Sequence, residues 1–143
     1  MLISQLLKAK GDMVFTAPPD ALLSHACELL RSRRVGALVV REGSGPVQGI
    51  LSERDVVRAM AEEGASALER PVSLCMTADV VFAHPDESVD ALLARMTDRR
   101  FRHLPVCEGG RLVGLVSIGD LVKAKIAETE QEAAGLKAYI AAG

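Results

Sequence analysis

Apolar residues recur at helical spacing in two separate parts of the chain. Each part has four of them at positions i, i+3, i+4 and i+7. They are Leu23, Ala26, Cys27 and Leu30 in the first part, and Val89, Leu92, Leu93 and Met96 in the second. Residues with this period lie on one face of an α-helix, and we expect that face to be buried in each part.

Each predicted helix is followed by a short apolar run of the kind found in β-strands. The runs are ALVV at residues 37–40 and HLPV at residues 103–106, and each ends in a glycine-rich turn. After the turn, VQGILS or LVGLVS leads into a further helix that starts near Ser52 or Ser117. The predicted order in each part is therefore strand, helix, strand, turn, strand, helix.

The two parts are copies of one unit. Residues 14–40 align with residues 80–106, so that Pro19-Asp20 falls on Pro85-Asp86. GILSERDVVRA at residues 49–59 falls on GLVSIGDLVKA at residues 114–124. We expect Asp20 and Asp86 to cap the first helix of each copy, because an aspartate accepts hydrogen bonds from the free amides of a helix start. Neither copy is long enough for a core of its own, so we expect the two to pack together.

The repeat predicts the domain organisation. The first repeat, with an N-terminal helix, is placed at residues 1–70, the second repeat at 71–126, and a helical tail at 127–143. Gly64 and Pro71 interrupt the connection between the repeats. Pro105 predicts that its strand lies at a sheet edge or beside a site, because proline has no N–H for a strand partner.

Composition excludes several function classes. The formal net charge is −2 and aromatic residues make up 3% of the chain, so neither a broad positive field nor a base-stacking surface for nucleic acid is expected. No apolar run reaches the roughly 20 residues of a membrane span. The three cysteines are widely spaced and indicate reduced core thiols rather than a disulfide or zinc framework. We find no catalytic or metal-ligating motif, and expect a soluble, cytoplasmic protein that is not an enzyme.

The two copies, each ending in G-h-x-S-x-x-D, resemble a tandem CBS-domain pair, or Bateman module. The segments GILSERDVVRAM, CMTADV and FRHLPVCEGGRLVGLVSIGDLVKA resemble small stand-alone bacterial members of that family, and the resemblance covers residues 2–126. It implies a mixed α/β (α+β) fold of two β-α-β-β-α repeats with pseudo-two-fold symmetry. It also implies a cleft between the repeats that binds an adenine nucleotide: AMP, ADP, ATP or NAD(H).

The first copy of the motif contains groups that suit a nucleoside phosphate. Ser52 opens a helix whose free amides attract an anion. Asp55 lies one turn along on the same side, where its carboxylate can accept both ribose hydroxyls, and Arg54 carries a fork of donors for phosphate. The alternative is purely structural: Ser52 caps the helix, and Asp55 favours its first turn.

The second copy keeps Ser117 and Asp120 but has Gly119 where the first has Arg54. Arg102 and His103, on the neighbouring strand, are candidates to replace the missing phosphate donor. His103 is alternatively a half-buried histidine that bonds to a backbone carbonyl. The contrast predicts two sites that differ in ligand or affinity.

The resemblance adds positions that hold the adenine through the backbone at the start of a strand. The further predicted site residues comprise these backbone positions, their neighbours in sequence and the nearby basic side chains. They are Thr16, Ala37, Leu38, Ala83, Arg102, His103, Leu104 and Pro105.

The sequence therefore predicts a nucleotide sensor, with two alternatives. One is a ligand-free dimerisation or protein-interaction module, and the other is an enzyme of a type that the motifs do not reveal. The resemblance also implies a homodimer, because pairs of this family associate through their helices. The second helices here carry more apolar residues than one small core needs, which supports it: Val56, Val57, Met60, Leu121 and Val122. The sequence does not identify the effector protein on which such a sensor would act.

Overall fold

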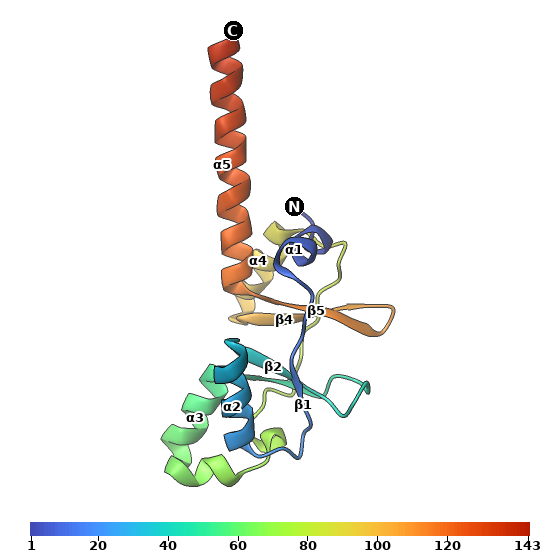
Figure 1. Ribbon diagram of the computed structural model, residues 1–143, viewed down its shortest axis with the longest axis vertical. Helices are drawn as coiled ribbons and strands as arrows, with labels where there is room; N and C mark the ends of the chain where they lie inside the picture. Colours follow the sequence, from blue (N-terminus) through green and yellow to red (C-terminus); the bar gives the residue numbers. More distant parts are fainter. The chain divides into compact units, whose positions relative to one another are not determined.

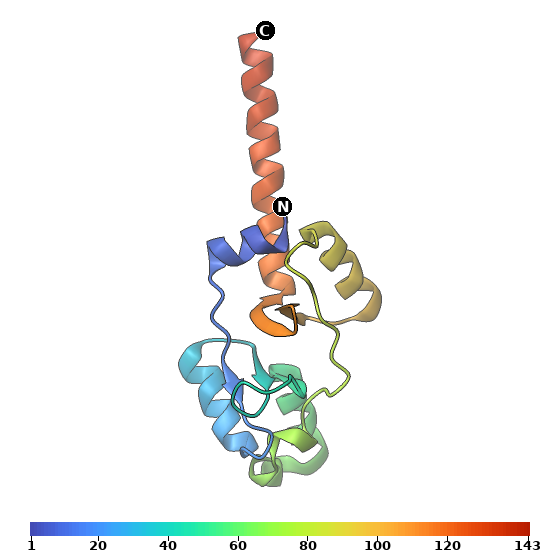
Figure 2. The ribbon, with the colours of Figure 1, turned by 90° about the vertical axis from the view of Figure 1, so that its right-hand side faces the viewer.

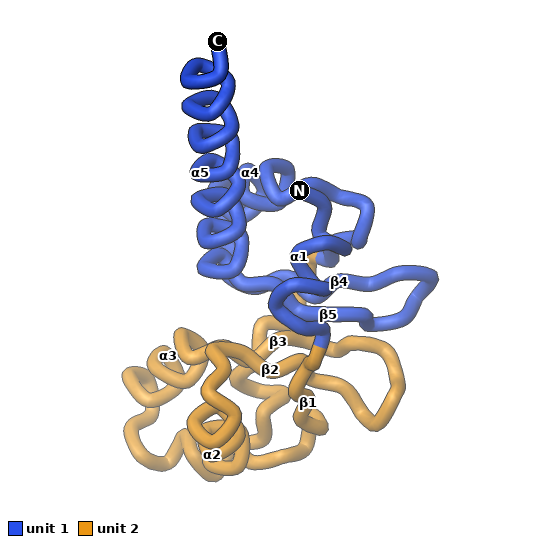
Figure 3. The backbone as a smooth tube through the Cα atoms, turned by 45° about the horizontal axis from the view of Figure 1, so that its top comes forward, with its two compact units in different colours: residues 1–12, 82–143 blue, residues 13–81 orange.

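The computed structural model describes all 143 residues and divides them into two compact units. Unit 1 comprises residues 1–12 and 82–143, and unit 2 comprises residues 13–81 (Figure 3). Each unit contains one copy of the repeat and is described by itself below. None of the helices combines the length and the apolar character that crossing a membrane requires.

Unit 2 contains a three-stranded sheet in the order β1-β2-β3 (Figure 1). β2 (Ala37–Val40) pairs in parallel with β1 (Thr16–Ala17) and antiparallel with β3 (Gly49–Ser52), and all four β2 residues are buried. The helices are α2 (Leu23–Arg33) and α3 (Glu53–Glu63), followed by the 3₁₀ turns η1 (Gly64–Glu69) and η2 (Val72–Leu74). The predicted face of α2 enters the core through Leu23, Ala26 and Leu30, which confirms the helical period.

Unit 1 contains a two-stranded antiparallel sheet of β4 (His103–Glu108) and β5 (Arg111–Ser117). Gly109 and Gly110 both have positive φ, at 59° and 76°, and close this hairpin in two residues. The helices are α1 (Ile3–Lys10), α4 (Val89–Arg99) and α5 (Ile118–Ala142). Val89, Leu92 and Met96 form the buried face of α4, again as the period predicts.

The predicted helix caps are wrong. α2 starts after Leu22, and α4 starts after Ser88, whose Oγ accepts a hydrogen bond from the Ala91 N–H at 3.1 Å. In both repeats the residue before the helix is held extended by an isolated bridge, Leu22 to Pro71 and Ser88 to Leu2. Because an extended residue cannot continue a helix backwards, the aspartates at 20 and 86 remain in the preceding turn.

The compact units divide the chain differently from the predicted boundaries. The N-terminal helix α1 lies in unit 1, where the Ile3 N–H donates to the Glu87 carbonyl at 2.9 Å and Leu7 faces Gly114. Residues 71–81 lie in unit 2, where Thr77 and Ile50 exchange backbone hydrogen bonds of 2.9 and 3.0 Å. Each repeat is thus completed by the segment that precedes the other repeat in sequence.

The predicted tail at residues 127–143 is helical as far as Ala142. It continues the second helix of the repeat, and α5 runs for 25 residues without a break at Gly135. Figures 1 and 2 both show α5 extending well beyond α1 and α4. Leu121 near its start is fully buried, whereas residues 129–143 are exposed on every side.

Candidate functional site

In unit 2 the start of α3 lies beside the start of β2. Ala37 is the register partner of Ser52, and the Glu53 N–H donates to the Gly36 carbonyl at 3.0 Å. The structure therefore brings together the predicted motif residues Ser52, Arg54 and Asp55 with the predicted strand start.

Asp55 is already fully engaged. Its side chain is buried, at 3% exposure for the residue. Oδ2 accepts hydrogen bonds from the Ser52 N–H at 2.9 Å and from Ser52 Oγ at 3.2 Å. Oδ1 accepts from Arg58 at 2.9 Å and from Thr77 Oγ1 at 3.2 Å. This is the capping arrangement of the structural alternative, and a ribose would have to displace at least one of these donors.

In unit 1 the same backbone arrangement recurs. His103 is the register partner of Ser117, and the Ile118 N–H donates to the Arg102 carbonyl at 2.8 Å. Ser117 Oγ accepts from the Asp120 N–H at 3.1 Å, and the Ser117 N–H donates to Asp120 Oδ2 at 2.9 Å.

Asp120 differs from Asp55 in its other partner. Lys10 Nζ lies 3.0 Å from Asp120 Oδ2 and donates to the Leu115 carbonyl at 2.7 Å. Burial raises the pKa of Asp120, but the Ser117 N–H and the Lys10 ammonium together lower it by more, so the pKa lies below its usual range. Both contacts reach Oδ2, which leaves Oδ1 as the oxygen open to a ligand.

Asp120 lines a pocket in unit 1, and it is the one predicted site residue among those that line that pocket. A pocket of about 270 Å³ between α1 and α5 contains Asp120, with the cationic side chains of Lys10 and Lys123. The other residues that line it are Met1, Leu6, Ala9, Ala124 and Ala127. Unit 2 has a pocket of about 430 Å³ between α2 and α3. Glu53 is the one motif residue that lines this pocket, and the other lining residues are Cys27, Leu30, Arg31, Val56 and Val57.

The strand positions predicted to hold adenine are mostly core positions. Their side chains are buried at Ala37, Leu38, Ala83, Leu104 and Pro105. Only the backbone of these residues is therefore available to a ligand. Thr16 lies on β1 opposite Val39, which places it away from the start of α3. Arg54 and Arg102 are exposed, and His103 is half-buried and has a partner.

Three contacts of the motif aspartates were missed by sequence reasoning. They are those of Arg58, Thr77 and Lys10. Arg58 follows Asp55 at i+3, a spacing that could have indicated it. Thr77 and Lys10 lie 22 and 110 residues from their aspartates, and no local pattern links them.

The remaining candidates are side chains of the metal-ligating types and the three cysteines. No group of three or more His, Cys, Asp or Glu side chains is arranged to hold a metal ion. Cys27, Cys75 and Cys107 are free thiols of intermediate exposure, and burial raises the pKa of Cys27 and Cys75. A raised pKa leaves little reactive thiolate at neutral pH.

The fold and the two equivalent helix starts define a class of protein: an α+β module built from two copies of one strand-and-helix unit. The chain belongs to the CBS-domain family, whose pattern matches it twice, at residues 11–62 and 72–127. The predicted fold class and the resemblance are therefore confirmed.

The relatives are CBS-domain proteins of several kinds. The chain is 34% identical to the mitochondrial CBS domain-containing protein CBSX3 of Arabidopsis thaliana in an alignment of 149 positions that covers 99% of this chain and 72% of that protein. The crystal structure of ATU1752 from Agrobacterium tumefaciens is 44% identical, with a TM-score of 0.85 over 87% of this chain and 99% of the other. The CBS-domain pair of MJ0100, crystallised with 5′-methylthioadenosine and S-adenosyl-L-methionine, shares the fold at 23% identity, with a TM-score of 0.79 over 90% of this chain and 98% of that one. In some longer plant relatives the matching segment is only 23% of the protein.

Proposed function

We propose that this chain is a non-enzymatic regulatory module that binds an adenine nucleotide at the two repeated helix starts. The observation that carries the proposal is the repetition itself. In both units a serine N-cap is the register partner of the first residue of a largely buried strand, and an aspartate follows the serine one turn along the helix. The adenosyl ligands in the MJ0100 structure support the same ligand class for this chain.

The chemistry of each helix start suits the parts of a nucleotide. The first amides of α3 and α5 attract the phosphate, and the Ser52 and Ser117 hydroxyls add a donor. The aspartate accepts ribose hydroxyls, and the backbone at the strand start is available to the adenine edge. Which of AMP, ADP, ATP or NAD(H) is bound depends on how many phosphate groups can pair with the nearby cationic side chains.

Asp120 is the better placed of the two aspartates to accept a ligand. It lines a pocket and has an oxygen without a protein partner, whereas both oxygens of Asp55 are engaged. We therefore expect the site at the start of α5 to fill first. The site at the start of α3 fills only if the ribose replaces the Thr77 or Arg58 contact.

Calorimetric titration of the full chain tests this order. Adenosine, AMP, ADP, ATP and NAD are titrated into wild type, Asp55→Asn and Asp120→Asn, and native mass spectrometry checks for co-purified ligand. Loss of a charged acceptor is expected to weaken the tighter site ten- to a hundredfold in Asp120→Asn, which corresponds to about 1.5–3 kcal/mol. Asp90→Asn, an exposed acidic change on α4, is the control. Unchanged binding in the Asp55→Asn/Asp120→Asn double variant would exclude these sites.

The second candidate function is a ligand-free interaction module. The observation that favours it is that four protein donors engage both carboxylate oxygens of Asp55, which satisfies this group without a ligand. The predicted homodimer is compatible with either candidate function. Of its predicted residues, Val57 on α3 and Val122 on α5 are exposed, whereas Leu121 belongs to the core. No thermal shift with any of the five ligands, together with a dimer mass by light scattering, would favour this alternative.

A further inference from the structure

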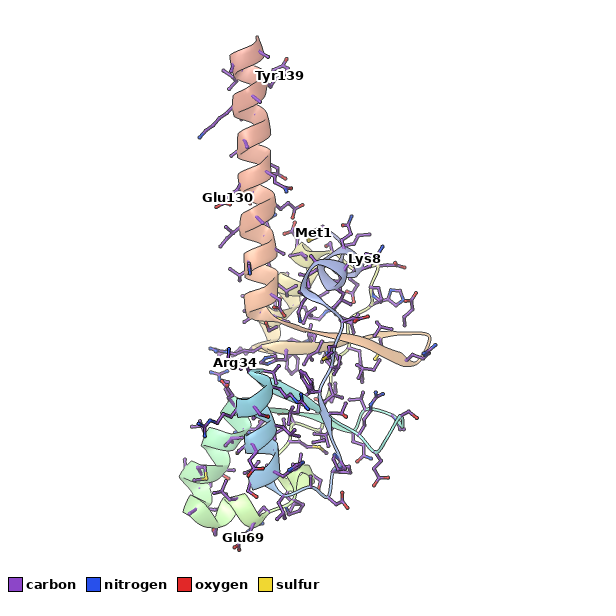
Figure 4. All side chains as sticks on the ribbon, viewed as in Figure 1. Met1, Lys8, Arg34, Glu69, Glu130 and Tyr139 are labelled. Carbon is purple, nitrogen blue, oxygen red and sulfur yellow. The ribbon has the colours of Figure 1, made fainter.

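The exposed part of α5 carries a continuous stripe of small and apolar residues. The stripe consists of Val122, Ile126, Thr129, Ala133, Leu136 and Ile140, spaced alternately by four and three residues. This is the a/d spacing of a coiled coil. Ile126, Leu136 and Ile140 are 54%, 60% and 66% exposed, so the apolar side chains of the stripe contact little in their own chain. Figure 4 shows that the side chains around Glu130 and Tyr139 extend into open space.

A helical segment of this length gains little stability alone. Residues 129–142 bury nothing within unit 1, and isolated helices shorter than about 12–15 residues are marginal in water. Thr129 does not oppose burial of the stripe, because its Oγ1 donates to the Lys125 carbonyl at 2.9 Å and is satisfied within the helix.

The charges beside the stripe identify the partner. With Ile126 at a, the g positions include Lys125 and Glu132, and the e positions include Glu130 and Lys137. In a parallel, in-register pair each g residue faces the e residue five positions further along the other helix. Lys125 then faces the partner's Glu130, and Glu132 faces the partner's Lys137, so both pairs are of opposite charge. Within the chain Lys125 also pairs with Asp90, and Glu132 and Lys137 have no ion pair of their own.

The opposite orientation is disfavoured by the same charges. An antiparallel pair that aligns the full stripes brings Glu130 against the partner's Glu130 and Glu132 against the partner's Glu132. Lys123 then faces the partner's Lys137. Like charges at these positions select against a pairing.

We infer that residues 122–142 of α5 form a parallel two-stranded coiled coil with the same segment of a second copy of this chain. No residue of the stripe lines the pocket beside Asp120, and the inference does not depend on ligand binding. It assigns the exposed part of α5 to self-association.

Disulfide crosslinking tests the geometry in the full chain. Leu136→Cys places a thiol in the stripe, and Ala138→Cys places one on the outward f position two residues away, in the same background of native cysteines. Under mild oxidation, Leu136→Cys is expected to form a covalent dimer at least tenfold faster than Ala138→Cys. Equal rates would overturn the inference.

Charge exchange tests the orientation by sedimentation equilibrium. Glu132→Lys is expected to weaken self-association several-fold, and Glu132→Lys/Lys137→Glu is expected to restore it. Gln131→Lys, which introduces a lysine at an outward f position, is the control. All changes are on exposed positions, and an unchanged thermal midpoint by circular dichroism confirms an intact fold. Failure of the double variant to restore association would contradict the parallel pairing.

Discussion

Asp55 and Asp120 occupy the same place in two copies of one motif, yet their surroundings differ. Asp55 is buried and receives four hydrogen bonds, one of them from Thr77. Asp120 is partly exposed, lines a pocket and is held by Lys10. Thr77 and Lys10 each belong to the segment that completes one repeat but precedes the other repeat in sequence. The motif therefore fixes where the carboxylate lies, and a residue far away in sequence decides how available it is.

The two sheets differ for a local reason. In unit 2 the Val39 N–H donates to the Phe15 carbonyl at 3.1 Å, and β1 joins β2 as a strand. The repeat places Pro105 at the position of Val39, and proline has no N–H to donate. In unit 1 only a bridge between Ala83 and Val106 remains, with backbone bonds at 2.9 Å on either side of it. One residue thus accounts for a three-stranded sheet in one unit and a two-stranded sheet in the other.

The largest expected effect separates the two aspartates by stability. Asp55→Ala leaves the part-buried Ser52 N–H and Thr77 hydroxyl without their acceptor, and is expected to cost about 1–3 kcal/mol. Asp120→Ala removes a partly exposed cap and ion pair, and is expected to cost about 0.5–1 kcal/mol. Urea unfolding measures the loss of unfolding free energy in both variants, and Asp90→Ala is the control at an exposed position. Equal losses would show that the burial of Asp55 has no energetic consequence.

A smaller effect is expected from exchanging the sheet residues. Val39→Pro removes the hydrogen bond to Phe15 and is expected to cost about 1–2 kcal/mol, because the carbonyl loses its partner. Pro105→Val is the matched reverse change, and we expect it to alter the free energy of unfolding by less than about 1 kcal/mol. Hydrogen exchange at Arg41, whose N–H donates to Ala17 at 3.1 Å, reports directly on β1. Unchanged protection of Arg41 in Val39→Pro would contradict the role given to Pro105.

Local patterns predicted the elements well because they depend on neighbours in sequence. The buried face of α2 follows from the period of Leu23, Ala26 and Leu30, and the Ser52 to Asp55 spacing predicted a helix start. The placement of α1 was not predictable in this way. Its buried residues Ile3, Leu6 and Leu7 indicate an amphipathic helix, but the period does not say which repeat receives it. The Lys10 to Asp120 contact was missed for the same reason.

Acid titration is expected to act on unit 1 through two carboxylates. Burial raises the pKa of Glu87, but the Arg95 guanidinium and the His84 N–H lower it by more; the pKa of Asp120 is also lowered. A carboxylate with a lowered folded pKa stabilises the fold above its usual value near pH 4. That stabilisation is lost as the pH falls from about 4 through the folded pKa.

The measurement is the urea midpoint at several pH values between 5 and 2. Lys10→Met removes one cause of the lowered pKa of Asp120, and Glu87→Gln removes the other titrating group. Each is expected to flatten the loss of stability below pH 4. Lys8→Met is the control, because Lys8 lies on the same helix as Lys10 but has no ion pair. It is expected to keep the wild-type dependence of the urea midpoint on pH. A wild-type slope in both test variants would contradict the linkage.

The smallest expected effect concerns Gly119, the counterpart of Arg54. Gly119 is exposed and helical, without a positive φ, and an added Cβ would lie 3.6 Å from Ser117 Oγ, an ordinary contact. In Gly119→Arg the gain in helix propensity, about 1 kcal/mol, is offset by a cation at a helix start, so stability is expected to change by less than about 0.5 kcal/mol.

If the proposed nucleotide site is correct, the new guanidinium strengthens AMP binding severalfold at α5 and leaves adenosine binding unchanged, because only AMP carries the phosphate that it pairs with. Calorimetry in an Asp55→Asn background isolates that site, and Arg54→Gly in an Asp120→Asn background tests the reverse change at α3. Equal changes for AMP and adenosine would mean that this position does not contact phosphate in either repeat.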